Sequence, residues 1–388
     1  MRVIYFSNLP FSDCDFPLIK EMQHRKIDVY YFLSINPSTS RCALVDIKKM
    51  YDKNGIFKAA EIYPQFLEYK NYIDLDKVYV VNYTTDAGLS LANVTLTYRM
   101  VRTFMKLKPD IVQITWPLQS TRCMLYLLRK KLVLTLHDPF PHSDKPRAKE
   151  FEMWRKLSFR MIDRIIILNK SQLEPFSRLY SYPLKKIYPA WLGLYDCING
   201  VKPIKFDIHK RYVLFFGYIS KYKGIEYLLE AFNSLQNKYK DVQLVIAGKG
   251  ELYFDKSLYT GKENITIIND YINIPRLSGL LQDASFVVCP YKDATQSGVI
   301  QTAFSMDCPV VVSNVGALPE AVDDGETGLI VPPCDTKALA SAIDKMLSDG
   351  RLLQKMRKNI NDKWRIKMGW DKILDKYLEC YHSIIKDN

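Results

Sequence analysis

Short apolar runs alternate with longer amphipathic stretches along almost the whole chain. In the first half the runs cover residues 3–7, 28–33, 77–83, 110–116, 132–137 and 164–168, and in the second half 212–216, 243–247, 265–268, 286–289, 310–312 and 328–331. Runs of this length with many β-branched residues are typical of buried strands. Between the first two runs of the second half, apolar side chains recur at helical spacing after Gly224, namely Ile225, Leu228, Leu229, Phe232 and Leu235. Strands that alternate with helices predict an α/β fold with doubly wound parallel sheets covered on both faces.

The pattern occurs twice and is interrupted once. Residues 196–210 are polar and weakly patterned, and they contain the turn-forming pairs Asn199-Gly200 and Lys202-Pro203. We therefore predict an N-terminal Rossmann-like domain over residues 1–195, a linker over 196–210 and a second Rossmann-like domain over 211–365. Residues 366–388 form a separate C-terminal segment, within which 370–386 have the spacing of an amphipathic helix.

Composition places the chain among large globular proteins. Its 388 residues are 48% hydrophobic and 25% charged, which excludes a disordered chain and suits two domains. No apolar run is long enough to cross a membrane, and the N-terminal run is too short for a signal peptide. The eight cysteines lack paired C-x-x-C spacing, and several lie in apolar strands, which favours reduced core thiols in a cytoplasmic protein over disulfides or zinc.

The net charge of +13 suggests an anionic partner. Basic residues cluster over 122–131, where Leu125, Leu127 and Leu128 adjoin Arg129, Lys130 and Lys131, and again over 145–160. Apolar and basic residues on one helix indicate contact with an anionic membrane surface. The alternative is that the leucines face the core and the charges face water. Nucleic acid is disfavoured, because the sequence has no basic-aromatic module or helix-turn-helix pattern.

Residues 286–331 hold the most specific chemical signal. An apolar strand leads into a polar loop, and a helix is predicted to begin at Gln296-Ser297-Gly298. The first turn of a helix presents free backbone N–H groups and the positive end of the helix dipole, both of which attract a diphosphate. Gly298 lets a ligand oxygen approach the backbone, and Ser297 can cap the helix or donate its hydroxyl.

These segments resemble the retaining glycosyltransferases of family 4, which have the two-domain GT-B architecture. The matching pieces cover residues 212–348: Phe216-Gly217, Lys223-Gly224, the stretch 245–250, Ala284 to Pro290, Pro309-Val310-Val311, the stretch 316–320 and the stretch 324–329. The resemblance implies two Rossmann-like domains that face each other across a cleft, with residues 1–195 on the acceptor side and residues 211–365 binding a nucleoside diphosphate sugar as donor. It also implies a last helix, within residues 366–388, that crosses back to the N-terminal domain. It implies no cofactor and no metal ion.

The chain departs from the family pattern at three positions. Ala294 and Thr302 stand where most members have two glutamates, and Tyr218 stands where they have an arginine. A subset of the family resembles this chain in having a Thr-Gln-Ser-Gly-Val turn, here residues 295–299. We therefore interpret the second domain as a variant donor site that keeps its diphosphate-binding part.

The predicted site residues fall into groups by role. Lys223 follows the strand 212–216 between two glycines, at the carboxyl edge where doubly wound sheets bind ligands. With Gly217, Ser297, Gly298 and Val299 it is predicted to hold the diphosphate. Glu320 resembles the family carboxylate near the donor, with helix capping as the alternative. We assign the base and ribose to the loop at Tyr271 and to Thr302, and the sugar to His137, Asp293 and Gln296.

His137 ends the strand 132–137 of the first domain. A histidine at that edge can hydrogen-bond a sugar hydroxyl or carry a proton, and a purely structural imidazole is the alternative. Asp13 and Asp15 have the spacing of a metal-binding pair, but without a third ligand we expect them to lie in a solvated loop. Lys223, His137 and Glu320 are therefore the predicted catalytic residues.

We expect a cytoplasmic, metal-independent hexosyltransferase, peripheral on the inner face of the membrane, that acts on a glycan or lipid-linked glycan in surface polysaccharide biosynthesis. Two alternatives remain open. One is a nucleotide-sugar epimerase or hydrolase of the same fold, and the other is a non-catalytic subunit that binds a partner glycosyltransferase. Turnover of the donor separates the three.

Overall fold

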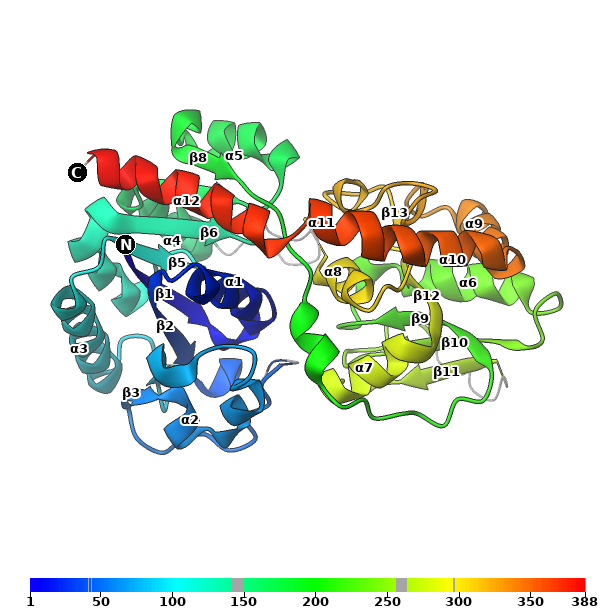
Figure 1. The fold of residues 1–388 in the computed structure, drawn as a ribbon, viewed down its shortest axis with the longest axis horizontal. Helices are drawn as coiled ribbons and strands as arrows, with labels where there is room; N and C mark the ends of the chain where they lie inside the picture. Colours follow the sequence, from blue (N-terminus) through cyan, green and yellow to red (C-terminus); the bar gives the residue numbers. More distant parts are fainter. Residues whose placement is uncertain (41, 43, 141–148, 256–263, 296, 388) are drawn as a thin grey trace. The chain divides into compact units, whose positions relative to one another are not determined.

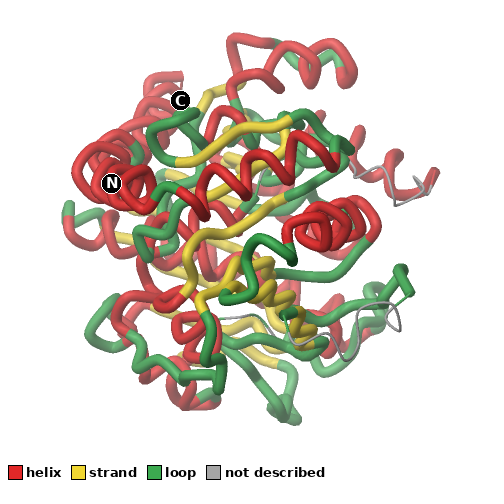
Figure 2. The backbone as a smooth tube through the Cα atoms, turned by 90° about the vertical axis from the view of Figure 1, so that its right-hand side faces the viewer, coloured by secondary structure: helices red, strands yellow, loops and turns green. Residues whose placement is uncertain are grey.

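A computed structural model describes the chain except for residues 41, 43, 141–148, 256–263, 296 and 388. The chain divides into two compact units (Figure 1). Unit 1 holds Met1–Pro139, the segment that ends at Gly193 and the C-terminal segment from Trp370, and unit 2 holds Leu194–Gly369. In Figure 2 the strands run between layers of helices, as expected for sheets covered on both faces.

Unit 1 is built on one sheet with the strand order β3-β4-β2-β1-β5-β6-β7-β8. All neighbouring pairs are parallel except β3 with β4, so the sheet carries one antiparallel edge strand that the sequence pattern did not predict. Its strands are β1 (Arg2–Asn8), β2 (Asp28–Ile35), β3 (Gly55–Lys58), β4 (Val78–Asn82), β5 (Ile111–Ile114), β6 (Leu132–Leu136), β7 (Arg164–Ile167) and β8 (Ile187–Pro189). Its helices are α1 (Ser12–His24), α2 (Ala59–Ile62), α3 (Leu91–Leu107), α4 (Lys149–Met161), α5 (Leu173–Tyr180) and α12 (Trp370–Asp387), with short 3₁₀ segments that include η1 (Leu9–Phe11) and η5 (Ser120–Lys131).

Unit 2 has the strand order β11-β10-β9-β12-β13-β14, with all neighbours parallel. The strands are β9 (Arg211–Phe216), β10 (Val242–Ala247), β11 (Ile265–Ile268), β12 (Ala284–Cys289), β13 (Val310–Ser313) and β14 (Gly328–Val331). The helices are α6 (Ile225–Leu235), α7 (Ile274–Asp283), α8 (Gly298–Ser305), α9 (Thr336–Ser348), α10 (Gly350–Asn359) and α11 (Arg365–Lys367). Short segments include η8 (Asp196–Gly200), η9 (Lys221–Lys223) and η11 (Pro319–Ala321), and a π-helical turn (Ile360–Trp364) links α10 to α11.

In each sheet the order of the strands changes direction at the strand that comes first in the sequence of that unit, β1 or β9. In unit 2 the order places β9 beside both β10 and β12, and in unit 1 it places β1 beside both β2 and β5. Loops from the two sides of such a reversal diverge at the carboxyl edge and leave room for a ligand there. The topology therefore selects the β9–β12 and β1–β5 edges as the places to look for sites.

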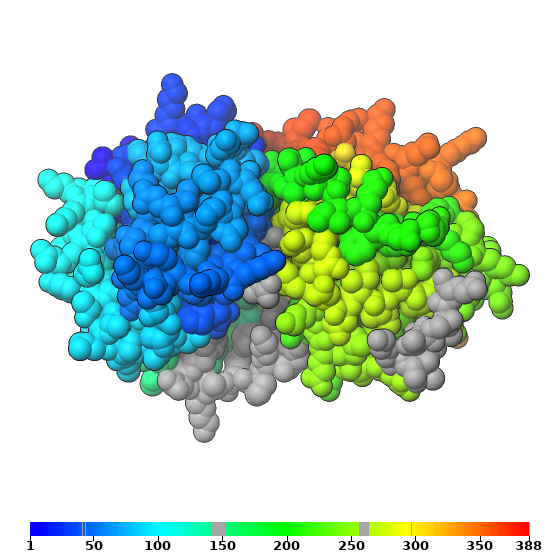
Figure 3. Space-filling view, turned by 90° about the horizontal axis from the view of Figure 1, so that it is seen from below, coloured from blue at the N-terminus to red at the C-terminus, as the bar shows by residue number. Residues whose placement is uncertain are grey.

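The stretch 196–210, which the sequence predicted as a linker, packs on unit 2. The backbone N–H of Ile204 donates to the carbonyl of Pro275 in α7 at 2.9 Å, and Cys197 and Ile198 in η8 are buried. Figure 3 shows this segment, in green, on the surface of unit 2.

The C-terminal helix α12 belongs to unit 1, where it packs against α1, β7 and β8 (Figure 1). Its buried face carries Ile373, Leu374, Tyr377, Cys380, Tyr381 and Ile384. Polar contacts tie the same face to the sheet: the Tyr381 hydroxyl donates to Gln113 Oε1 at 3.1 Å, and the Tyr377 hydroxyl lies 3.2 Å from Thr135 Oγ1. Apolar burial with satisfied polar groups fixes the helix in one register.

Candidate functional site

The loops after β9 and β12 are held together at the strand-order reversal of unit 2. Gly224 has φ +63°, and a Cβ added there would lie 2.1 Å from the carbonyl oxygen of Pro290. The Lys292 N–H donates to the Tyr222 carbonyl at 2.8 Å, and the Lys292 ammonium pairs with Glu226 at 2.8 Å. Only glycine combines this backbone conformation with this close approach. The two loops therefore form one rigid edge.

Lys223 lies at the centre of this edge. Its side chain is only 8% exposed, and its ammonium lies 3.8 Å from the ring centroid of Tyr291 and 5.0 Å from that of Tyr222. A cation above aromatic faces is held in place while it keeps its charge. The charge of Lys223 also affects Cys289 in β12. Burial raises the pKa of the Cys289 thiol to about 11, and the nearby Lys223 ammonium opposes that rise. The sequence did not single out Tyr291, although an aromatic residue directly after the buried strand β12 was the available signal.

Tyr291, which contacts Lys223 through its ring, also contacts the start of helix α8. Ser297 is its N-cap residue, but the side chain makes no capping hydrogen bond and instead lies 3.4 Å from the Tyr291 hydroxyl. A Cβ added to Gly217 would lie 3.5 Å from Val299 Cγ2, so the loop after β9 and the first turn of α8 are in van der Waals range. The structure thus brings together Gly217, Lys223, Ser297, Gly298 and Val299. The positive end of the α8 dipole, the Ser297 hydroxyl and the Lys223 ammonium lie at the same edge of the sheet, which suits a diphosphate.

At the two positions where the family glutamates are missing, the side chains are mostly buried. Thr302 is 6% exposed and its hydroxyl donates to the carbonyl of Gly298 at 2.8 Å. Ala294 is 5% exposed, and its carbonyl oxygen would lie 1.6 Å from a Cβ added to Gly316, which has φ +53°. This contact brings the loop that carries Glu320 next to the loop after β12. Glu320 itself is exposed in η11.

The remaining predicted residues of unit 2 have different surroundings. The Tyr271 N–H donates to Asp270 Oδ1 at 2.7 Å, and its carbonyl accepts from Arg276 in α7 at 2.9 Å, so both backbone groups already have partners. Asp293 is partly exposed in the loop after β12, and Tyr218 is 66% exposed. Gln296 lies outside the described residues.

His137 follows β6 in unit 1, and its partners come from the start of α1. Its ring stacks on Phe11 with centroids 4.4 Å apart, and its Nε2 lies 3.9 Å from the Cys14 thiol. Burial lowers the pKa of His137 to about 4. The imidazole is therefore neutral near pH 7 and offers one donor and one acceptor, which suits a hydrogen bond to a hydroxyl better than proton donation.

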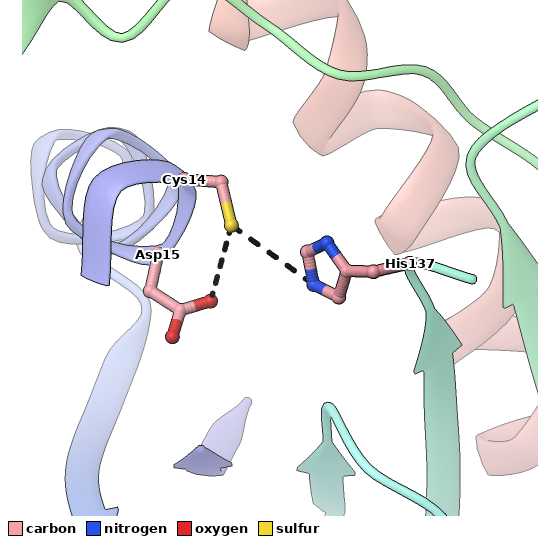
Figure 4. Close-up of side chains that lie close together, drawn as sticks. All are labelled: Cys14, Asp15 and His137. Atoms are coloured by element: carbon pink, nitrogen blue, oxygen red, sulfur yellow. Dashed lines mark hydrogen bonds between the residues drawn. The ribbon is translucent and has the colours of Figure 1, made fainter. Parts of the chain in front are cut away.

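Asp15 completes this cluster, and the expectation that Asp13 and Asp15 lie in a solvated loop is wrong. Both are in the first turn of α1, and Asp15 is fully buried, where its carboxylate accepts from the hydroxyls of Tyr5 at 2.8 Å and Tyr31 at 3.0 Å. Burial raises the pKa of Asp15 to about 7. Figure 4 shows Cys14 between Asp15 and His137, with ligand-type atoms of all three within 4.8 Å of one another. Sequence reasoning missed the cluster because 123 positions separate Cys14 from His137.

A cavity of about 430 Å³ opens at the carboxyl edge of the sheet in unit 1. Loops after β1, β2, β4 and β5 line it, which is the arrangement expected at the β1–β5 reversal. The lining residues are Asn8, Pro10, Phe11, Asn36, Ser38, Thr39, Tyr83, Thr85, Asp86, Gly88, Asn93, Trp116, Gln119, Ser120, Thr121 and Arg122. Phe11 belongs both to this lining and to the stack on His137.

The basic stretch 122–131 forms the 3₁₀ segment η5 rather than an α-helix. Leu125 is fully buried, so the prediction that it joins a membrane-facing surface is wrong, whereas Leu127 is 68% exposed beside exposed Arg129 and Lys130. Helix α4 contacts η5 and presents Met153, Lys156, Leu157 and Arg160 on one exposed stripe. In the part of the chain that is described, no helix has both the length and the apolar character needed to cross a bilayer.

Comparisons with known proteins agree in both halves of the chain. Residues 210–349 match the family model described as Glycosyl transferases group 1, and residues 57–191 match that of Glycosyltransferase Family 4. An uncharacterised glycosyltransferase of Methanocaldococcus jannaschii is 26% identical over 56% of this chain and 59% of its own length. A capsular polysaccharide biosynthesis glycosyltransferase of Staphylococcus aureus is 28% identical over 42% of this chain and 44% of its own length. The chain thus spans about half the length of these relatives.

A solved structure confirms the predicted fold class. The Anabaena protein HepE, determined with UDP-glucose, superimposes with a TM-score of 0.68 over 99% of this chain and 100% of its own, at 14% sequence identity. Two parallel-sheet α/β domains of the GT-B type are therefore the fold of this chain.

Exchange of Gly224 for alanine tests how rigidly the edge is built. Gly325 has φ +74° but no atom within 4 Å of an added Cβ, so it is the matched control. We expect Gly325→Ala to lower the free energy of unfolding by about 1 kcal/mol, the usual cost of the left-handed conformation. Gly224→Ala should cost about 2–5 kcal/mol, because the clash with Pro290 adds to it. Urea unfolding measures both, and equal losses would contradict the close packing.

The pKa of Asp15 predicts a pH-dependent stability. Because folding raises this pKa to about 7, the stability that Asp15 contributes is complete below its unfolded value near 4 and is lost as the pH rises through 7. The stability of Asp15→Asn relative to the natural protein should therefore increase by roughly 2–4 kcal/mol between pH 4.5 and 7.5. The lowered pKa of His137 acts in the opposite direction, but it is common to both proteins and largely cancels.

Urea unfolding at several pH values measures this difference. Asp52→Asn, which removes an exposed carboxylate of the same unit, is the matched control for the loss of one carboxylate. A flat difference for Asp15→Asn would show that the buried carboxyl is ionised as readily as an exposed one.

Proposed function

Because the chain belongs to the family-4 glycosyltransferases, we propose that it transfers a hexose from a nucleoside diphosphate sugar to a glycan or lipid-linked glycan acceptor in surface polysaccharide biosynthesis. The observation that carries this proposal is the convergence of Lys223, Ser297 and the first turn of α8 at the strand-order reversal of unit 2. The names of the relatives support it: one acts in capsular polysaccharide biosynthesis, and HepE was determined with a UDP-sugar.

The proposed step breaks the bond between the anomeric carbon and the β-phosphate oxygen and forms a bond from that carbon to an acceptor hydroxyl on the same face. The hydroxyl proton passes to the departing phosphate oxygen. Negative charge develops on the nucleoside diphosphate, and the main task of the protein is to stabilise it. The Lys223 ammonium and the N–H groups of Ser297, Gly298 and Val299 supply fixed positive charge, and the step needs no metal ion.

Sugar recognition is assigned to groups other than the missing glutamates. We assign Asp293, Gln296 and neutral His137 to the hydroxyls of the sugar, and Glu320 to the donor as well. The Thr302 hydroxyl, which donates to its own helix, retains acceptor capacity for a ribose hydroxyl. Tyr271 offers its side chain to the base, since its backbone N–H and carbonyl are engaged.

Removal of the Lys223 ammonium should remove nucleotide binding. A ligand at about 100 times its Kd stabilises a protein by roughly 2.7 kcal/mol, which thermal unfolding detects readily. We expect a stabilising shift with UDP or another nucleoside diphosphate, and Lys223→Ala should weaken that binding roughly tenfold or more, since one charge-assisted hydrogen bond is lost. Lys221→Ala, an exposed lysine two positions away, is the control.

Product analysis distinguishes the remaining alternatives. Release of nucleoside diphosphate that depends on a glycan acceptor supports transfer. Release in its absence or epimerised donor would indicate a hydrolase or an epimerase, and binding without turnover would indicate a non-catalytic subunit.

We also propose that the protein acts in the cytoplasm, peripherally on anionic membrane, through the exposed stripe of α4 and Leu127 with Arg129 and Lys130 in η5. Leucine side chains that insert into the headgroup region supply apolar burial, and the basic residues supply attraction to anionic lipid.

Vesicle sedimentation tests this membrane contact. Vesicles with phosphatidylglycerol should bind the protein, and purely zwitterionic vesicles should bind it less. The double variant Leu127→Ser/Leu157→Ser should lower the binding about tenfold or more. Leu67→Ser, which removes a 50% exposed leucine elsewhere in unit 1, should leave the binding unchanged. Equal binding of all three proteins would refute this surface.

A further inference from the structure

The cavity of unit 1 contains a guanidinium that lacks a counter-ion among the described residues. Arg122, at the start of η5, donates from Nη2 to Asn8 Oδ1 at 2.9 Å and to Ser34 Oγ at 2.8 Å, and it lies 5.5 Å from the ring centroid of Phe6. All three partners are neutral. Burial lowers the pKa of Arg122, but a guanidinium keeps its charge at neutral pH.

Part of this guanidinium is uncommitted. In the described part of the chain, Nε and Nη1 of Arg122 make no hydrogen bond or ion pair. Neither atom is fully closed to solvent. These N–H groups therefore remain accessible in the cavity wall. Because both hydrogens of Nη2 are engaged by Asn8 and Ser34 at the ends of β1 and β2, the plane of the guanidinium is fixed, and Nε and Nη1 can each donate a single hydrogen bond to an oxyanion.

Two residues of the cavity lining also have uncommitted oxygen atoms. Asn93 is only 4% exposed, and its Nδ2 donates to the carbonyls of Thr85 at 3.1 Å and Ala87 at 2.9 Å, which fixes the orientation of the amide. Its Oδ1 then has no partner among the described residues, and neither has the buried Ser120 Oγ. Both oxygen atoms are closed to solvent, so they lie behind the surface of the cavity and do not serve as ligand contacts.

We propose that this cavity binds the sugar acceptor, and that the acceptor carries an oxyanion, phosphate or carboxylate, beside its ring hydroxyls. Arg122 in the cavity wall binds the oxyanion, and the cavity accommodates the sugar ring. The rings of Phe11, Tyr83 and Trp116 in the lining supply apolar faces for the ring carbons of a sugar. This assignment rests on the proposed function, because only a glycosyltransferase needs a sugar acceptor.

Asp86 is the acidic residue in the lining, and its substitution provides a second, independent test of the charge of the ligand. It is exposed, and its carboxylate accepts from the Ser38 N–H at 3.3 Å and from the Ser38 hydroxyl at 3.0 Å. A carboxylate at this position repels an anionic ligand. Its neutral isostere should therefore strengthen the binding of an anion, whereas loss of Arg122 should weaken it.

Calorimetric titration with glucose 6-phosphate, glucuronate, inorganic phosphate and glucose tests the proposal. Saturating UDP is present so that the diphosphate site of unit 2 is occupied. We expect at least one of the charged sugars to bind at least tenfold more tightly than glucose, and comparison of the phosphate with the carboxylate identifies the anion. Binding of inorganic phosphate alone as tightly as the sugar phosphate would overturn the assignment of the cavity to a sugar.

Three variants test whether the preference for a charged sugar over glucose arises in this cavity. Arg122→Gln retains an N–H donor for Asn8 and Ser34 but removes the charge, and it should reduce the preference for the charged sugar about tenfold or more. Asp86→Asn, a change at an exposed position, should increase that preference. Arg99→Gln, which removes an exposed arginine of α3 outside the cavity lining, should change nothing.

The outcomes separate this inference from the proposed function. If UDP binds in a Lys223-dependent way but both charged sugars bind no better than glucose, the acceptor assignment falls and the proposed function stands. If the charged sugar binds through Arg122 but no nucleoside diphosphate binds, the anion site stands and the glycosyltransferase proposal falls. A preference for the charged sugar that is unchanged in both Arg122→Gln and Asp86→Asn overturns the inference.

Discussion

The contact between the loops after β9 and β12 is the constraint on which the donor side depends. Gly224 touches the Pro290 carbonyl, and the Lys223 ammonium lies over the ring of Tyr291, so the cation and the first turn of α8 are fixed relative to each other before any ligand arrives. A charge that is already in place costs no reorganisation when negative charge develops on a leaving group. Loss of the family glutamates leaves both contacts intact, because neither the Gly224–Pro290 contact nor the Lys223–Tyr291 contact involves Ala294 or Thr302.

The two units use the same structural principle for different chemistry. Each sheet reverses its strand order beside its first strand, and the polar groups described above gather at that reversal. In unit 2 the edge offers a buried ammonium and the first turn of a helix, which favour a diphosphate. In unit 1 the edge offers an anchored guanidinium and aromatic rings, which favour a sugar ring with one negative group. Each unit thus has a site chemistry of its own.

Much of the fold was predictable from the sequence, because the buried strands carry an unmistakable apolar pattern. The predicted strands lie where β1, β2, β4–β7 and β9–β14 are found, with ends that differ by one or two residues. Short edge strands such as β3 and β8 lack that pattern and were missed. The turn at Gly217, Lys223 and Ser297 could be placed because glycines and turn residues mark it within short stretches of sequence.

Contacts between distant residues could not be predicted in this way. The approach of Cys14 to His137, the burial of Asp15 between two tyrosines, and the pairing of Arg122 with Asn8 and Ser34 all depend on which strands are neighbours. Leu125 and Leu127 have the same character and differ only in which side of η5 they occupy. Such features need the strand order and the packing, which no local pattern contains.

A crystal structure of the protein with UDP is the most direct test of the central claim. The account predicts that the diphosphate lies within hydrogen-bond reach of the Lys223 ammonium and of the N–H groups of Ser297, Gly298 and Val299. A diphosphate bound elsewhere, for example against Arg122 in unit 1, with the β9–β12 edge empty, would contradict it.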